Sequence, residues 1–482
     1  MKNKILYILI GMFTIMSCKI DDLNDSSKEV KIAPPEFVLT SAQKSLFDAL
    51  VTHGVFENHF RLFSQYFAGT DFLSDQTNFI NLNSFPTNFW LELNRNVLSD
   101  LELASQTLAD NPITGEPVEI TQNKNSILEV LKIFTYHVLV DSYGDIPYSE
   151  AIDIENLTPK YDDAKDIYTD IIARLDNAIN LFDSGFGSFG EADVMYQGDI
   201  SKWIKFANSL KLRLALRIAD VDGTKASTMA SEAVNGGVFS SNDDNATLAY
   251  EEASPNRNPA WFEIINRGRT DYVASEIIVN TMLPINDPRL SIYLDDNVSP
   301  FVGGPFGSIN EYEDFSHIGS AVLNPSQEGV IMDYAEVEFL LAEAAERSLA
   351  GTSTDAEAHY NAAITASLEY WEATDVDNDP NTDDVAIYLA NPGVAYTTAS
   401  GTWQEKIGTQ KWIALFNRGF EGWSSYRRLG FPDLPNTSGG NPVPRRVIYP
   451  IREYNTNNNN VSGAASKIGG DLLTTKVFWD AN

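Results

Sequence analysis

Acidic side chains occupy alternate positions along the stretch from Asp375 to Asp384. Calcium in proteins takes about six to eight oxygen ligands, and alternate spacing brings such oxygens to one side of a tight loop. Two positions depart from the calcium loop of an EF-hand, because Pro380 replaces the turn glycine and Ala386 replaces the final glutamate. A solvated acidic turn between two helices is the alternative interpretation. The candidate calcium ligands are Asp375, Asp377, Asp379, Asn381 and Asp383.

The sequence lacks the residue patterns of common catalytic sites. Its five histidines form no zinc-binding H-E-x-x-H arrangement, and none pairs with a reactive cysteine. Neither a nucleophile elbow nor a nucleotide-binding phosphate loop is present in the sequence. With 67 acidic residues, carboxylate pairs of the kind that flank a scissile glycosidic bond are expected by chance. We therefore expect no enzyme, and a glycoside hydrolase is the alternative.

The single cysteine, Cys18, follows an apolar stretch typical of an exported protein. This stretch, 5–16, comes after a short basic end and is too short to cross a bilayer as a helix. The residues before Cys18 resemble a bacterial lipoprotein cleavage site, although Met16 stands where a small residue is usual. The lysine and acids after Cys18 resemble the signal that sends some lipoproteins to the cell surface. We expect a signal peptide over 1–17, a lipid anchor on Cys18 and a flexible tether over 18–35; a free thiol is the alternative.

The composition is that of a globular protein with a strongly acidic surface. Of the 482 residues, 43% are hydrophobic and 21% are charged, which is sufficient for a sizeable core. The formal net charge is −33, from 34 Lys and Arg against 67 Asp and Glu. Because such a surface repels phosphate backbones, we expect no nucleic-acid partner.

Apolar residues recur at intervals of three and four, which predicts amphipathic helices. The predicted helices at 337–344 and 356–368 resemble a tetratricopeptide unit, although no regular period of about 34 residues runs through the chain. Regions rich in glycine and proline predict long loops, and 446–449 predicts a short β-strand. We expect a mainly α fold of tetratricopeptide-like helical pairs with long irregular loops and a few short β-hairpins, in a single domain over 36–482. The predicted helices lie at 127–139, 167–182, 203–218, 337–344 and 356–368.

Motifs spread along the chain carry a family resemblance. They read V-D-S-Y-G-D-I-P-Y at 140–148, N-S-L-K-L-R at 208–213, N-D-P-R-L at 286–290, Q-K-W-I-A-L-F at 410–416, R-R-V-I-Y-P at 445–450 and F-W-D at 478–480. With the signal and Cys18, their order resembles the SusD/RagB-type nutrient-binding outer-membrane lipoproteins, especially the divergent SusD-like branch. The resemblance implies a tetratricopeptide-like scaffold with an irregular ligand-binding half. It also implies a partner, a SusC-like TonB-dependent transporter over which the lipoprotein sits as a lid.

A capture protein of this kind needs no cofactor, and calcium is the one additional ligand that the sequence indicates. Aromatic rings in loop-like, polar contexts can stack on the apolar faces of sugars, while oligopeptides would add backbone hydrogen bonds. Core packing is the alternative for each ring. We predict that Trp90 contributes more to ligand binding than to folding, and that Trp412, on an apolar helix face, does the reverse. The candidate ligand-binding residues are Tyr66, Phe67, Asp71, Asn88, Trp90, Trp261, Arg269 and Tyr312.

The sequence thus favours a surface lipoprotein that captures oligosaccharide or oligopeptide nutrients and passes them to a SusC-like transporter. Two alternatives stay open. One is a surface glycoside hydrolase that uses a carboxylate pair, and the other is a structural scaffold of the transporter complex that binds no small ligand.

Overall fold

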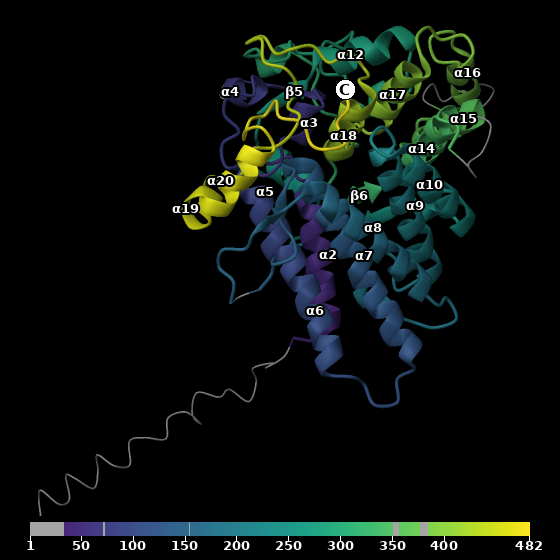
Figure 1. Cartoon of the computed structure of the whole chain (residues 1–482). Coiled ribbons are helices and arrows are strands. Elements are labelled where there is room, and N and C mark those ends of the chain that lie inside the picture. The colour runs from purple at the N-terminus through teal and green to yellow at the C-terminus, as the bar shows by residue number, and fades with distance from the viewer. Residues whose placement is uncertain (1–32, 71–72, 154, 350–355, 376–383) are drawn as a thin grey trace, which may run out of the picture.

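Long helices packed in pairs form the scaffold of the protein (Figure 1). The computed structural model describes residues 33–70, 73–153, 155–349, 356–375 and 384–482. Within these residues α7 packs on α8, α9 on α10, and α14 on α15. The scaffold helices are α2 (Pro35–Val51), α6 (Ser99–Asp110), α7 (Val118–Tyr143), α8 (Ala164–Leu181), α9 (Ile200–Ile218), α10 (Gly223–Gly236), α14 (Tyr334–Glu346) and α15 (Ala356–Tyr370).

Shorter helices and long loops cover the upper end of the scaffold in Figure 1. The short α-helices are α3 (Phe60–Phe63), α4 (Ser74–Thr77), α5 (Phe85–Leu91), α11 (Pro259–Trp261), α12 (Glu276–Met282), α13 (Leu290–Tyr293), α16 (Asp384–Ala390), α17 (Trp403–Ala414), α18 (Gly419–Leu429), α19 (Ile451–Thr456) and α20 (Asn458–Lys467). Two segments are π-helical, η3 (Glu92–Leu98) and η6 (Phe262–Asn266). The 3₁₀ turns are η4 (Gly190–Ala192), η5 (Asn242–Asp244), η7 (Leu283–Ile285) and η8 (Tyr312–Asp314).

The helix ends follow local sequence signals. Asp163 caps α8 by accepting hydrogen bonds from the backbone N–H groups of the first turn, and Asp199 caps α9 in the same way. Helix α7 ends at Gly144, whose φ of 82° lies in a region that glycine enters without steric cost. The predicted helices and the mainly α fold are therefore confirmed.

The described strands form small two-stranded sheets between segments that are separated in the chain. Antiparallel pairs join β1 (Phe67–Gly69) to β5 (Tyr272–Ala274), β2 (Ile146–Pro147) to β3 (Tyr161–Asp162), and β4 (Ala246–Leu248) to β6 (Gly329–Met332). The predicted strand at 446–449 is wrong. Instead, the backbone N–H of Val447 donates to the carbonyl of Ser142 at 2.7 Å, so this segment binds the end of α7.

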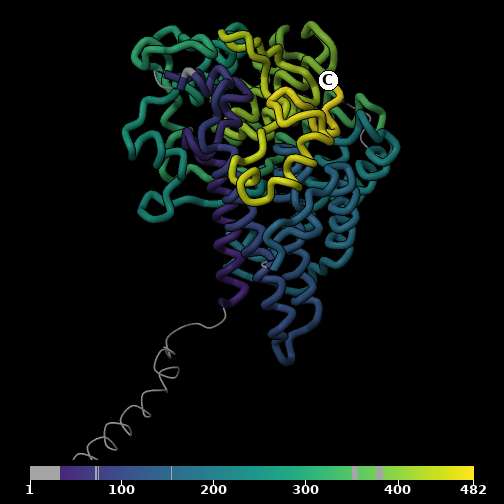
Figure 2. The backbone as a smooth tube through the Cα atoms, turned by 60° about the vertical axis from the view of Figure 1, so that its left-hand side comes forward, coloured from purple at the N-terminus to yellow at the C-terminus, as the bar shows by residue number. Residues whose placement is uncertain are grey.

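The C-terminal part of the chain packs back onto the first half (Figure 2). Helix α18 lies against α3, and Trp479, near the C-terminus, is only 1% exposed. The indole N–H of Trp479 donates to Asp141 of α7 at 2.7 Å. The guanidinium of Arg427 lies 3.4 Å from the ring centroid of Trp423 and 4.6 Å from that of Trp479. These contacts hold the C-terminal residues against the scaffold and the loop region.

Candidate functional site

Three distant segments meet at the end of the β1–β5 sheet. Gly69 pairs with Tyr272, and the backbone N–H of the next residue, Thr70, donates to the carbonyl of Asp271 at 3.0 Å. The Thr70 hydroxyl donates to the carbonyl of Thr270 at 2.6 Å. From a third segment, the amide of Asn310 donates to the carbonyl of Gly69 at 2.8 Å. These bonds fix the loop ends and leave a hollow between them.

This hollow, which we name the Tyr312 cavity, has a volume of about 510 Å³. Its walls are mostly polar and carry several carboxyl groups, which suit the hydroxyl groups of a sugar because a carboxylate accepts hydrogen bonds. The residues that line it are Thr70, Thr270, Asp271, Asn310, Glu311, Tyr312, Glu313 and Asp314.

Tyr312 is the aromatic residue of this wall, and His317 lies behind it. The ring of Tyr312 stacks on the ring of His317, with 3.8 Å between the centroids and 18° between the planes. A hydrogen-bond distance of 3.1 Å also joins Nε2 of His317 to the carbonyl oxygen of Tyr312. Burial raises the pKa of Tyr312, and the charges of Glu313 and Asp295 add to the rise. The phenol therefore stays protonated at neutral pH and can donate a hydrogen bond.

The charged groups of the Tyr312 cavity are almost all acidic. A basic group, the guanidinium of Arg269, lies at the edge of the cavity, where it forms an ion pair with Asp271. The hydrogen bond from Arg269 to Asp271 raises the pKa of the guanidinium, so Arg269 stays charged. Among the described residues, no group of three or more His, Cys, Asp or Glu side chains is arranged to hold a metal ion.

A second hollow, which we name the Glu92 cavity, lies between α2, α5, η3 and α11 and has a volume of about 380 Å³. Acidic, amide, guanidinium and aliphatic groups all contribute to its walls. Its lining residues are Asp48, Ala49, Thr52, Glu57, Asn88, Phe89, Leu91, Glu92, Arg95 and Pro259.

The structure brings half of the predicted ligand-binding residues to the cavities or their edges. Tyr312 lines one cavity and Asn88 the other, while Arg269 braces Asp271 in the first. Trp261 is partly exposed beside Pro259, and the guanidinium of Arg257 lies 4.8 Å from its ring centroid. Asp71 lies outside the described residues.

The expected exposure of three predicted rings is wrong. Tyr66 is fully buried, where its hydroxyl donates to the carbonyl of Trp412 at 2.6 Å. Phe67 is 1% exposed and packs on Phe416. Trp90 is 6% exposed and meets Tyr143 edge to face at 5.0 Å. Since these rings fill the core, we no longer assign them to a ligand site.

Trp412, which the sequence placed on an apolar helix face, is buried as predicted, and three other tryptophans are buried with it. Trp203, Trp412 and Trp423 are fully buried, and Trp371 is 9% exposed. Sequence reasoning missed Thr70 and Asp271 as parts of the site. Their positions depend on contacts between distant loops, and no periodic pattern marks such contacts.

The predicted calcium and lipid sites lie largely beyond the described residues. Of the calcium candidates, only Asp375 is described, and it is exposed. Asp377, Asp379, Asn381 and Asp383 lie outside the described residues, as does Cys18 with the whole signal and most of the tether. Calcium binding and lipidation stay predictions.

The fold and the site place the chain in the class of helical-scaffold proteins that carry a polar cavity between long loops. The family model described as "Starch-binding associating with outer membrane" matches residues 26–450, and the chain belongs to this SusD-like family. A comparison with the curated proteins gave no match. Within the described part of the chain, every helix is too short or too polar to cross a membrane.

Several solved structures have the same fold as this chain and are similar to it in sequence. A chitin-binding protein is 28% identical, with 93% of this chain and 100% of that chain covered and a TM-score of 0.79. A chitin-binding SusD homologue from Flavobacterium johnsoniae is also 28% identical, with 93% and 98% covered and a TM-score of 0.74. A SusD homologue from Bacteroides uniformis is 28% identical, with 92% and 99% covered and a TM-score of 0.75.

Proposed function

We propose that this protein is a surface lipoprotein that binds an oligosaccharide in the Tyr312 cavity and passes it to a SusC-like TonB-dependent transporter. The observation that carries the ligand site is the ring of Tyr312, supported from behind by His317, in the wall of a polar cavity of about 510 Å³. A ring of this kind offers a flat face to the C–H groups of a sugar. The surrounding carboxylates and amides offer partners to its hydroxyl groups.

Chitin oligosaccharides are the first ligands to test. Two structural relatives that are 28% identical to this chain bear the description chitin-binding. The acidic wall of the Tyr312 cavity favours a neutral or amino sugar over an anionic glycan, because like charges repel. Binding without chemical change fits a site whose function is capture, so we propose that the protein is not an enzyme.

Replacing Tyr312 with alanine is expected to weaken the binding of chitohexaose about thirtyfold, which corresponds to about 2 kcal/mol. The loss follows from removal of the ring face that the sugar would contact. The melting temperature should change little, because Tyr312 lies at the cavity wall and is partly exposed. Isothermal titration calorimetry and thermal melting measure the two quantities separately.

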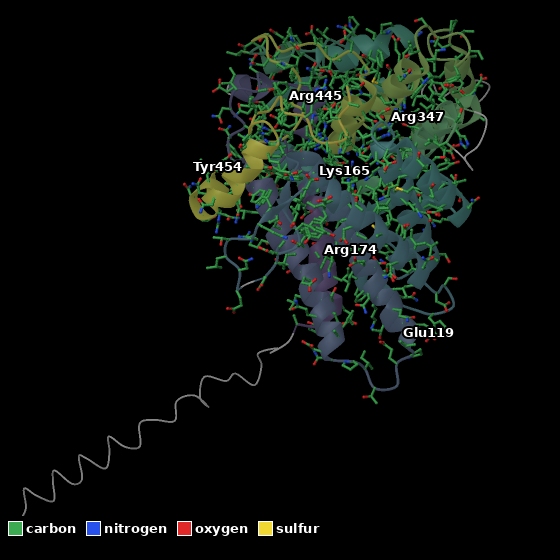
Figure 3. All side chains as sticks on the ribbon, viewed as in Figure 1. Glu119, Lys165, Arg174, Arg347, Arg445 and Tyr454 are labelled. Atoms are coloured by element: carbon green, nitrogen blue, oxygen red, sulfur yellow. The ribbon has the colours of Figure 1, made fainter. Side chains whose placement is uncertain are left out.

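Tyr454→Ala is the matched control, because this tyrosine lies on α19 and lines neither cavity (Figure 3). Its affinity for chitohexaose should equal that of the parent. Equal affinities of the parent and Tyr312→Ala would contradict the proposed site. The oligosaccharide should also be recovered intact after incubation, and its cleavage would instead favour the hydrolase.

We also propose that a lipid on Cys18 holds the protein at the outer membrane. Replacing Cys18 with alanine is expected to abolish the lipid-dependent mass increase and to move the protein into the soluble fraction. A single acyl chain binds a membrane only weakly, so firm retention depends on more than one chain or on contact with the transporter. Membrane fractionation and intact-mass spectrometry check the result. A variant that stays in the membrane with the parental mass would refute the anchor.

A further inference from the structure

One segment of the chain connects the two cavities. Pro259 lines the Glu92 cavity, whereas Thr270 and Asp271 line the Tyr312 cavity. The residues between them form α11 and η6 and then a short loop. With the usual rise per residue, this segment spans at most about 30 Å. Both cavities are therefore within reach of one extended polymer.

Apolar side chains on this connecting segment are open to solvent. Phe262 is 40% exposed and Ile265 is 52% exposed, while Trp261 is partly exposed. At the edge of the Glu92 cavity, Phe56 is 40% exposed, and its carbonyl accepts a hydrogen bond from Asn88 at 3.1 Å. Rings of this kind can contact successive sugar faces along a chain.

Charged groups lie on this segment and beside its start. Glu57 lines the Glu92 cavity, Glu263 belongs to η6, and Arg269 pairs with Asp271 in the Tyr312 cavity. The pKa of Glu263 is raised, mainly by burial, and the negative charge of Glu57 adds to the rise. The positive charges of Arg267 and Arg269 act against it. The guanidinium of Arg267 pairs with the carboxylate of Glu263 at 2.9 Å, so both hydrogen-bond donors and acceptors lie between the cavities.

The Glu92 cavity itself has the mixed lining of a sugar site. Glu92 accepts a hydrogen bond from Asn96 at 2.7 Å, and Arg95 donates to the side-chain oxygen of Asn96 at 3.0 Å. Arg95 is exposed and forms no ion pair within the described part of the chain, so its remaining N–H groups are available to a ligand. The aliphatic face of Leu91 lies in the same wall.

Of the π-helical segments in the described chain, one lines this cavity and the other begins three residues after Pro259, which belongs to its wall. Glu92 and Arg95 belong to η3, and η6 follows directly after α11, which supplies Pro259. A π-helical turn is rare and occurs frequently at functional sites, because its wider turn changes the direction of side chains. The π-helical turn of η3 in the wall of this cavity therefore agrees with a binding role.

We propose that the Glu92 cavity is a second glycan subsite, and that one oligosaccharide held in the Tyr312 cavity continues along residues 259–271 into it. This inference rests on the proposed function. It makes the protein a binder of long glycan chains, whose affinity increases with chain length. Short oligosaccharides would occupy the Tyr312 cavity alone.

A comparison of chitobiose with chitohexaose tests the second subsite. The parent should bind chitohexaose at least about tenfold more tightly than chitobiose. The double variant Glu92→Gln with Arg95→Ala should lose about tenfold in affinity for chitohexaose and nothing for chitobiose. Trp261→Ala should also weaken the binding of chitohexaose and leave the binding of chitobiose unchanged. Tyr312→Ala should weaken the binding of both oligosaccharides.

Arg452→Ala is the matched control for Arg95, because Arg452 is an exposed arginine on α19 that lines neither cavity. Unchanged chitohexaose affinity in the double variant and in Trp261→Ala would overturn the second subsite and leave the proposed function standing. Unchanged binding in Tyr312→Ala would contradict the proposed function instead. Failure of the parent to bind either oligosaccharide would overturn the subsite together with the chitin assignment.

Discussion

The variant Asp141→Ala is expected to lose about 3–5 kcal/mol of stability, because it leaves buried donors without their acceptor. Asp141 is fully buried on α7. It accepts hydrogen bonds from the hydroxyl of Tyr168 at 2.5 Å, the indole of Trp479 at 2.7 Å and Nε of Arg217 at 2.9 Å. His137 lies 3.2 Å away on the same helix. One carboxylate therefore links α7, α8, α9 and the C-terminal residues.

Urea denaturation measures this loss as a lower midpoint concentration. The control is Glu119→Ala on the same helix, because Glu119 lies at the far end of α7 (Figure 3). This control should change the free energy of unfolding by less than about 1 kcal/mol. Equal midpoints for the Asp141 and Glu119 variants would contradict the role of Asp141.

The pH dependence gives a second measure of the same contact. Burial by itself would raise the pKa of Asp141, but Arg217 and the hydrogen bond with His137 lower it to about 2 from 3.8. Because the folded-state pKa is the lower one, the unfolded chain binds the proton more tightly. The contribution is present above about pH 4 and is lost as the pH falls through about 2. Asp141→Asn should lack this part of the acid profile, and an unchanged profile would refute the assignment.

Replacing Trp90 with alanine is expected to cost about 3–5 kcal/mol of stability and to leave the ligand affinity unchanged. Trp90 is 6% exposed, lies edge to face on Tyr143 at 5.0 Å, and stacks on Tyr161 at 6.3 Å. Removing the indole would leave a cavity between α5, α7 and β3. This expectation reverses the one drawn from the sequence, in which Trp90 contacts the ligand.

Urea denaturation and calorimetry with chitohexaose together decide between the two interpretations of Trp90. Trp412→Ala is the reference, because Trp412 is fully buried and its indole donates to the carbonyl of Ser64 at 3.0 Å. Both variants should lose stability to a similar extent. A Trp90 variant with parental stability and weakened ligand binding would restore the prediction made from the sequence.

The sequence by itself determined the features that depend on neighbouring residues. The spacing of apolar residues predicted the helices at 127–139, 167–182, 203–218, 337–344 and 356–368. Local residues also set helix ends, since Asp199 caps α9 and Gly144 follows the last residue of α7. The apolar helix faces also placed Trp203 and Trp412 in the core. Each of these features follows from helical periodicity or from one backbone hydrogen bond, so a short window of sequence contains the information.

Only the tertiary structure decided which residues form the site. Thr70, Asp271 and Asn310 lie on separate segments, and their hydrogen bonds form when the β1–β5 sheet closes. Contacts between distant segments also decided that Trp90 is buried against Tyr143 and that Tyr312 lines a cavity. A polar neighbourhood in the sequence could not separate these two rings, because the burial of a loop aromatic depends on which distant helices pack over it.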